Sequence, residues 1–261
     1  MTSLNKTYAS YPSLMDRTVL ISGGTTGIGA DIVAQFVEQG AKVSFLGRNR
    51  DAAEKLIAAV AAEGSGRHVP LFLQCDVCDI PALQTAISAA RDHFGPISVL
   101  VNNAANDQRH SIEETTVASW DNGMAVNLRH QFFAAQAVMT DMQKLGGGSI
   151  INLGSISWKN KTGGMPAYTT SKAAIQGLTR SLARDLGPHN IRVNTLVPGW
   201  VMTEKQVTMW LDEAGDREID QMQCLKARLD SADISRMALF LAADDSKMCT
   251  AQDFIVDGGW V

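Results

Sequence analysis

The stretch Thr18-Val-Leu-Ile-Ser-Gly-Gly-Thr-Thr-Gly-Ile-Gly29 decides the fold. Its apolar run, Val19 to Ile21, predicts a buried strand, and the run stops abruptly at glycines. Apolar residues then recur at helical spacing, at Ile28, Ile32, Val33, Phe36 and Val37. The stretch therefore predicts a strand, a glycine turn and a helix.

The glycines of this turn have the spacing Gly23-x-x-x-Gly27-x-Gly29. Such a turn lets backbone N–H groups approach a phosphate at the helix N-terminus, where the helix dipole favours negative charge. A glycine turn before a helix also occurs as a mere tight connection. The turn alone does not decide between the two interpretations, so the rest of the chain must.

Composition restricts the class of protein. The 261 residues suffice for one large α/β domain or two small ones, and 45% apolar with 19% charged residues is typical of a soluble globular protein. The net charge of −4 gives no reason to expect nucleic acid or an anionic membrane as a partner. No run approaches the roughly 18 apolar residues of a membrane span. The first 16 residues lack the apolar region of a signal peptide, so we expect a cytoplasmic protein.

The chain has four cysteines, Cys75, Cys78, Cys224 and Cys249. The Cys75-x-x-Cys78 spacing is compatible with a redox pair or half of a zinc site, and equally with a strand end followed by a turn. No second C-x-x-C is present. We therefore expect reduced cysteines and no metal site.

Short apolar strands alternate with amphipathic helices to the end of the chain. Strands are expected at residues 43–46, 69–74, 97–101, 149–153, 191–197 and 254–256, and one long helical region at 120–142 carries Asn127. This alternation predicts a parallel sheet covered by helices on both faces, that is, one doubly wound α/β domain over residues 17–261. Residues 1–16 are expected to form a loose N-terminal arm, with Tyr8, Tyr11 and Leu14 as the residues that would dock it.

Residues 200–228 show poor periodicity and many polar groups. They follow the carboxyl end of a strand, where open α/β sheets bind their ligands. The sequence therefore predicts a long loop that forms a lid over a substrate site.

Three residues with complementary chemistry follow the fifth strand. Ser155 closes that strand, and Tyr168 and Lys172 lie four apart on one face of the next helix. A tyrosine, with a pKa near 10, needs a nearby cation to act as a base, and a serine hydroxyl can bind a substrate oxygen. The set suits proton transfer to or from that oxygen. Taken singly, each feature has another interpretation. Ser155 alone is equally typical of a helix cap, and Tyr168 with Lys172 is equally typical of a surface pair.

The motifs together resemble the short-chain dehydrogenase/reductase family. They are Thr18 to Gly29, Asn102-Asn103-Ala104, Asn127, Ser155, Tyr168-x-x-x-Lys172 and Pro198-Gly199-x-x-x-Thr203. The resemblance implies a seven-stranded Rossmann sheet and NAD(P)-dependent alcohol/carbonyl chemistry. Tyr168 would be the general acid/base, and Ser155 would orient the substrate oxygen. Lys172 would bind the nicotinamide ribose and lower the tyrosine pKa, and Asn127 would hold a water of a proton relay.

The resemblance also implies which residues bind the cofactor. They are Gly23, Thr25, Thr26, Gly27, Ile28, Gly29, Arg48, Asn49, Asp76, Val77, Asn103, Ala104, Ala105, Tyr168, Lys172, Pro198, Gly199, Val201 and Thr203. One departure is Ala105, where the family often has glycine, which narrows the space near the nicotinamide. A second is Gly47, where NAD-using members usually carry an acidic residue for the ribose hydroxyls. Arg48 and Arg50 follow instead, and a guanidinium suits the 2′-phosphate of NADP. We therefore predict NADP, with NAD and a merely solvated basic loop as the alternatives.

Further stretches resemble the branch of bacterial sugar 1-dehydrogenases that includes the D-xylose 1-dehydrogenases. They are Tyr11-Pro-Ser-Leu14, Asn106-Asp-Gln-Arg-His110, Val126-Asn-Leu-Arg-His130, Gly154-Ser-Ile-Ser-Trp158 and Gln223-Cys-Leu-Lys226. Such enzymes oxidise the anomeric hydroxyl of an aldose to a lactone. Candidate substrate residues are Asn106, Ser157, Trp158, Trp200 and Gln206, with Trp158 placed to stack on a sugar ring. The alternative interpretations are that Asn106 is a turn residue and that Trp158 is a core residue. An NADPH-dependent ketone or 3-oxoacyl reductase and a non-catalytic cofactor sensor are the alternative functions.

Two further features are interpreted structurally. The charged cluster of Asp107, Arg109 and His110 is expected to hold its loop rather than to supply a second base. The helix that carries Tyr168 has many small side chains, which let helices approach closely. Family resemblance then favours a homotetramer built partly on this helix, with residues 258–261 as another candidate contact.

Overall fold

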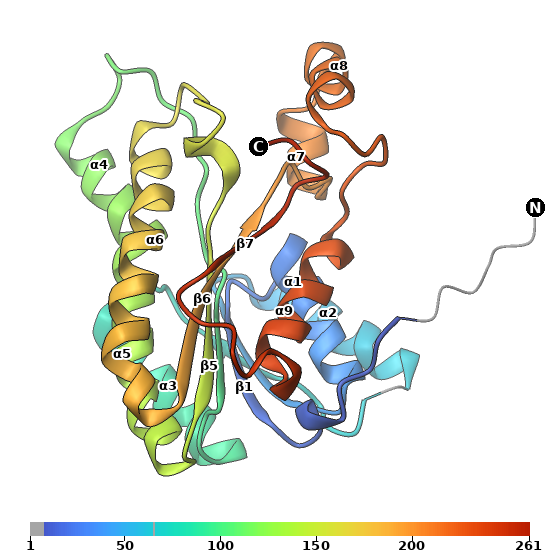
Figure 1. The fold of residues 1–261 in the computed structure, drawn as a ribbon, viewed down its shortest axis with the longest axis vertical. Coiled ribbons are helices and arrows are strands. Elements are labelled where there is room, and N and C mark those ends of the chain that lie inside the picture. Colours follow the sequence, from blue (N-terminus) through green and yellow to red (C-terminus); the bar gives the residue numbers. More distant parts are fainter. Residues whose placement is uncertain (1–7, 65) are drawn as a thin grey trace, which may run out of the picture.

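A computed structural model describes residues 8–64 and 66–261 of the chain. In this part of the chain seven strands form one sheet in the order β3-β2-β1-β4-β5-β6-β7 (Figure 1). The strands are β1 (Thr18–Ser22), β2 (Lys42–Gly47), β3 (Leu71–Gln74), β4 (Val99–Asn102), β5 (Gly148–Leu153), β6 (Ile191–Pro198) and β7 (Asp253–Val256). All six strand pairs are parallel. The predicted fold class, a doubly wound Rossmann sheet, is confirmed.

Helices cover both faces of the sheet, as Figure 1 shows. One layer holds α1 (Gly27–Glu38), α2 (Arg50–Glu63) and α9 (Ser231–Ala242), and the other holds α3 (Ile80–Phe94), α4 (Val117–Met124), α5 (His130–Lys144) and α6 (Pro166–Leu186). Alternate residues of each strand enter opposite cores: Val19 and Ile21 pack with α1 and α9, while Leu20 packs toward α3 and α5. Burial on both faces explains why the strands read as continuous apolar runs.

The topology creates a binding crevice at one edge of the sheet. The strand β1 lies between β2 and β4, and the chain crosses to the other half of the sheet after β3. At such a reversal the connections leave the carboxyl ends of β1 and β4 in opposite directions, which opens a crevice for a ligand. The glycine turn follows β1 at this point.

The helical region expected at 120–142 is not one helix. The helices α4 and α5 are separated by a π-helical segment, Ala125–Arg129, which carries Asn127. A π turn adds one residue to the helical repeat and is often found at functional sites. The apolar periodicity on either side is intact, which is why the sequence pattern did not reveal the interruption.

The lid segment, residues 200–228, was predicted as a loop, and that prediction is wrong. It contains α7 (Glu204–Met209) and α8 (Glu213–Met222), which project from one end of the molecule (Figure 1). The two ends of the segment meet, because Val201 and Leu229 form a parallel bridge. Both helices are short and mostly exposed, α7 having no buried residue and α8 only Gly215 and Ile219. Each helix is too short for the repeat of its apolar residues to be read in the usual window of about 11–18 residues.

The described part of the N-terminal arm, residues 8–16, is docked on the domain through Tyr8, Tyr11 and Leu14. The Leu14 side chain is fully buried, and the Tyr11 N–H donates to Gln39 Oε1 over 2.7 Å. The Arg236 guanidinium lies 3.6 Å from the Tyr8 ring centroid. The rest of the predicted arm, residues 1–7, lies outside the described residues. Among the described helices, none is long and apolar enough to cross a membrane.

Candidate active site

The glycine turn after β1 is shaped by close backbone contacts. A Cβ atom on Gly23, whose φ is +68°, would lie 2.7 Å from Ala104 Cα, and one on Gly29 would lie 2.0 Å from the Gly23 carbonyl oxygen. Asn103 Nδ2 donates to the carbonyl oxygens of Ser22 and Gly23, at 3.1 and 2.9 Å. This network fixes the turn against the end of β4.

The helix that follows the turn offers its N–H groups to an anion. Thr26 stands at the N-cap of α1, its side chain makes no capping bond, and the first turn holds no acidic residue. The first amide groups of a helix have no partner within the helix, so they are available to a phosphate. Gly27, with φ of +57°, stays open, since the nearest atom to an added Cβ would be 3.4 Å away. The residues present therefore fit a dinucleotide pyrophosphate.

The end of β2 is closely packed against the glycine turn. A Cβ on Gly47 would lie 2.5 Å from Thr25 Cγ2, so a larger residue would require the Thr25 side chain to move. The Arg48 side chain is 79% exposed, with Nη1 3.9 Å from Asp76 Oδ2. The Asn49 side chain caps α2 by accepting from the Ala52 N–H, and Asp76 Oδ1 accepts from the Cys78 N–H. Arg48 is thus an exposed cation at this edge, as is Arg50.

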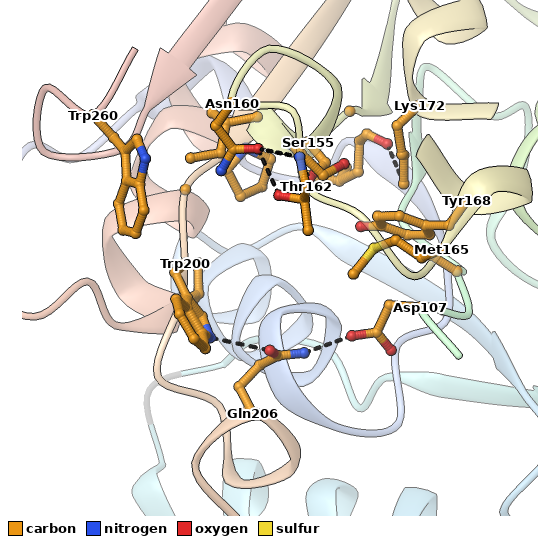
Figure 2. Close-up of a pocket in the computed structure, with 18 of the residues that line it drawn as sticks. Asp107, Ser155, Asn160, Thr162, Met165, Tyr168, Lys172, Trp200, Gln206 and Trp260 are labelled. Carbon is orange, nitrogen blue, oxygen red and sulfur yellow. Dashed lines mark hydrogen bonds between the residues drawn. The ribbon is translucent and has the colours of Figure 1, made fainter. Parts of the chain in front are cut away.

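Three of the four predicted catalytic residues, Ser155, Tyr168 and Lys172, line one cavity of about 530 Å³ (Figure 2), whereas Asn127 is not among its lining residues. The same cavity is lined by seven further predicted cofactor residues, Ile28, Asn103, Ala105, Pro198, Gly199, Val201 and Thr203. A hydride acceptor and a proton acceptor can therefore reach one substrate carbon and its oxygen here.

Burial is the largest influence on the pKa values of Tyr168 and Lys172. It raises the pKa of Tyr168 to about 12, with the charge of Asp107 adding to the rise and a hydrogen bond with Ser155 opposing it. Burial likewise lowers the pKa of Lys172 to about 7, against the attraction of Asp107. The net shift of the Tyr168 pKa is upward because burial of the phenol itself disfavours the charged phenolate. The lowering of this pKa by Lys172, which the resemblance implied, stays a prediction.

The polar atoms of the Asn127 side chain form hydrogen bonds with backbone groups. Its Oδ1 accepts from the Asn106 N–H at 2.8 Å, and its Nδ2 donates to the carbonyl oxygens of Asn106 and Gly123, at 3.0 and 2.9 Å. The π-helical segment thus ties the loop after β4 to α4. The role of Asn127 in a proton relay stays a prediction.

The candidate substrate residues divide into two groups. Ser157, Trp200 and Gln206 line the cavity. Asn106 and Trp158 are not among its lining residues: Asn106 Oδ1 accepts from the Gln108 N–H, as a turn residue does, and the Lys159 ammonium lies 4.6 Å from the Trp158 ring centroid. The geometry therefore favours the turn interpretation for Asn106 and gives no support to stacking by Trp158.

Several cavity residues were not expected from the sequence. The main ones are Asp107, Asn160, Thr162, Met165, Glu218 and Trp260. Trp260 is buried, and its ring centroid lies 6.5 Å from that of Trp200 (Figure 2). The chain returns to the site through Gly258 and Gly259, both with positive φ, so this Gly-Gly pair was the signal for a sharp turn. Asp107 follows β4 closely, which is the position where ligands are bound in such sheets.

Two further features of the sequence, the charged cluster after β4 and the four cysteines, have contacts that suit a structural role. The Arg109 guanidinium lies 4.6 Å from the centroid of the Trp210 ring, and the His110 N–H donates to the Gly164 carbonyl. The four cysteines are free thiols, and burial is the largest cause that raises the pKa of both Cys75 and Cys78. Across residues 8–64 and 66–261, no group of three or more His, Cys, Asp or Glu side chains is arranged to hold a metal ion.

Comparisons with known proteins agree with this geometry. A family model described as "Enoyl-(Acyl carrier protein) reductase" matches residues 23–261. The chain is 45% identical over 251 residues to the "Probable galactose dehydrogenase GalD" of Rhizobium meliloti (strain 1021), covering 96% of this chain and 97% of the relative. It is 43% identical over 253 residues to the D-xylose 1-dehydrogenase of Caulobacter vibrioides (strain NA1000 / CB15N), covering 97% and 98%.

A solved structure extends the agreement to the fold. A 7α-hydroxysteroid dehydrogenase complexed with NADH and 7-oxo glycochenodeoxycholic acid matches with a TM-score of 0.89 at 29% identity, covering 96% of this chain and 97% of that one. Fold, glycine turn and catalytic residues thus lead to the same conclusion as the comparisons. The chain belongs to the short-chain dehydrogenase/reductase family and is an NAD(P)-dependent oxidoreductase acting on a CH–OH group.

Proposed function

We propose that this enzyme oxidises the anomeric hydroxyl of an aldose to the lactone, with NADP as the preferred hydride acceptor. The observation that carries the proposal is the wall of the cavity opposite Ser155 and Tyr168. Trp200 Nε1 donates to Gln206 Oε1 at 3.1 Å, and Gln206 Nε2 donates to Asp107 Oδ2 at 2.7 Å (Figure 2). This row of hydrogen-bonded polar side chains, with a tryptophan ring face beside it, suits a ligand whose hydroxyls alternate with apolar ring faces.

The proton chemistry follows from the positions of the side chains. An anomeric hydroxyl within reach of Ser155 Oγ and Tyr168 Oη would give its proton to the Tyr168 phenolate, as the hydrogen on the same carbon leaves as a hydride. When bound, the oxidised nicotinamide accepts that hydride. Ser155 donates to the oxygen and orients it, while Lys172, whose Nζ donates to the Leu153 carbonyl at 2.6 Å, lies 5.5 Å from the Tyr168 ring centroid.

The residues around the adenosine end support NADP. Gly47 leaves no carboxylate to bind the ribose hydroxyls, and Arg48 is exposed beside it. A guanidinium binds a phosphate with two parallel hydrogen bonds, whereas a free ribose hydroxyl offers it no negative partner. Measured kcat/KM values for the two cofactors test this preference directly.

The substrate proposal is tested by a screen of free pentoses, hexoses and deoxyhexoses with NADP and with NAD. Cofactor reduction followed by trapping of the lactone as a hydroxamate is the expected result, and the Tyr168→Phe variant is the matched negative control. Oxidation of no aldose, together with NADPH-dependent reduction of a ketone or 3-oxoacyl compound, would reject the proposal in favour of a reductase.

We also propose that the enzyme is a cytoplasmic homotetramer. The support is the resemblance together with Phe132, which lies on α5 next to the Tyr168 helix and is 40% exposed. Light scattering at micromolar concentration gives the mass of the assembly, and a monomer would contradict this part of the proposal.

A further inference from the structure

Asp107 is a partly buried carboxylate on the wall of the active-site cavity. Its side chain is only 18% exposed, and both of its oxygens are held by the lid segment. Lys205 Nζ forms an ion pair with Oδ1, and Gln206 Nε2 donates to Oδ2 at 2.7 Å. Both partners lie on α7, so this helix holds the carboxylate in place from one side while the cavity lies on the other (Figure 2).

The electrostatic surroundings keep Asp107 ionised and locally neutralised. Burial opposes its charge, but the hydrogen bond and charge of Lys205 and the hydrogen bond from Gln206 hold the pKa of Asp107 below its usual range. A carboxylate has about four acceptor positions, and the α7 contacts use two. Because Lys205 already balances the charge, the remaining positions suit a neutral hydroxyl donor better than a second cation.

Other polar groups of the cavity are less suited to this task. Trp200 gives its N–H to Gln206, and Asn160 Oδ1 already accepts from the Thr162 hydroxyl at 2.6 Å. Glu218 is exposed on α8, where water competes for its carboxylate. Ser157 is buried and its hydroxyl has no partner among the described residues, but a hydroxyl is a weaker acceptor than a carboxylate.

We propose that Asp107 is a specificity-determining residue, whose carboxylate accepts a hydrogen bond from a ring hydroxyl of the substrate away from the reacting carbon. This inference rests on the proposed aldose oxidation. A substrate without such a hydroxyl would displace water from the partly buried carboxylate and return no donor, which costs binding energy in the transition state. The site would thus select polyhydroxylated over apolar substrates.

The test compares the best aldose with its monodeoxy analogues, each lacking one ring hydroxyl other than the anomeric one. The wild-type enzyme is expected to lose about 10- to 100-fold in kcat/KM on one particular analogue, the value of a hydrogen bond to a charged group. Asp107→Ala should lose a similar factor on the parent sugar and then less than about threefold more on that same analogue.

Lys205→Met is the matched control, since it removes the ion pair of Asp107 without removing its carboxylate. This variant should keep the full sensitivity to the same missing hydroxyl, whatever its overall activity. Asp107→Leu, which is close in size and has no acceptor atom, replaces Asp107→Ala if alanine lowers the melting temperature or abolishes cofactor binding.

Two different failures are distinguishable. Wild-type enzyme that oxidises no aldose rejects the proposed function and this inference with it. If the wild-type enzyme oxidises an aldose but an Asp107 variant discriminates against every deoxy analogue as strongly as the wild type does, only the proposed role of Asp107 is rejected.

Discussion

The ammonium nitrogen of Lys172 lies 2.6 Å from the carbonyl oxygen of Leu153, so α6 is tied to the end of β5 directly beside Ser155. Lys172 is 2% exposed, which makes it a buried cationic group at the centre of the site. We predict that Lys172→Met lowers kcat/KM by about 100-fold or more, because the proton-transfer group loses its neighbouring cation. Stability should change by only about 1–2 kcal/mol, since the loss of the hydrogen bond is offset by removal of a buried charge. Steady-state kinetics and urea unfolding measure both, and unchanged kcat/KM would contradict the role of Lys172.

Tyr168→Phe removes the hydroxyl that exchanges the proton and leaves the ring. We expect kcat to fall by about 10²- to 10⁴-fold, the usual contribution of a general acid/base. The dissociation constant of the cofactor, followed by quenching of tryptophan fluorescence, should stay within about threefold, because the ring still fills its site. A variant that turns over normally would show that another group is the base.

The pH dependence of oxidation follows from the raised pKa of Tyr168. Oxidation needs the phenolate, and burial raises the pKa of this residue to about 12. Log kcat/KM for oxidation is therefore expected to rise with pH from 7 to about 10, whereas reduction, which needs the phenol, should be favoured at lower pH. The hydrogen bond with Ser155 lowers the Tyr168 pKa, so in Ser155→Ala the rising limb should move to higher pH. A flat profile for the wild type would argue against the phenolate as base.

Arg48→Asp should reverse the cofactor preference. The change removes the cation and supplies a carboxylate beside Gly47, so we expect kcat/KM with NADP to fall by about 10- to 100-fold and kcat/KM with NAD to rise. Arg50→Gln is the control, since Arg50 lies nearby but stacks on the Phe72 ring, 5.8 Å from its centroid, and donates to Gln74. Equal losses in the two variants would mean that general positive charge, rather than Arg48 itself, attracts the phosphate.

Gly29→Ala tests the glycine turn. The new methyl group would lie 2.0 Å from the Gly23 carbonyl oxygen, so the turn must shift, and we predict loss of measurable cofactor binding with a fall in stability of about 1–3 kcal/mol. Gly177→Ala, on the exposed side of α6 with no atom within 4 Å of the added Cβ, should bind cofactor normally and gain up to about 1 kcal/mol. Cofactor titration and thermal unfolding of the pair decide the matter.

The fold was predictable because its signals are local. Each of the inner strands is a short run that is mostly buried on both faces, whereas the edge strands β3 and β7 are partly exposed. Tyr168 and Lys172 were found because a spacing of four places them on one helix face, which requires no knowledge of the tertiary structure. The π-helical segment was not found, since one added residue hardly disturbs an apolar pattern.

The substrate wall was predicted only in part: Ser157, Trp200 and Gln206 were expected there, whereas Asp107 and Trp260 were not. Asp107, Gln206 and Trp260 come from three distant parts of the chain, and only packing brings them into one cavity. The helix α7 carries no buried residue, so nothing in its sequence pattern revealed that its Gln206 and Lys205 reach Asp107. The direction of the Tyr168 pKa depends on burial, which spacing along a helix does not report.

The bridge between Val201 and Leu229 has a consequence for how such an enzyme diversifies. Met202 donates its N–H to the Leu229 carbonyl at 2.8 Å, so residues 202–228 leave and re-enter the domain at a single point. Doubling the length of an excursion with joined ends costs only about 0.6 kcal/mol in closure entropy. Residues 202–228 can therefore be replaced as a unit. Grafting a counterpart of another length or composition would change the substrates of the enzyme, while the nucleotide-binding half, built on β1 to β4, would stay the same.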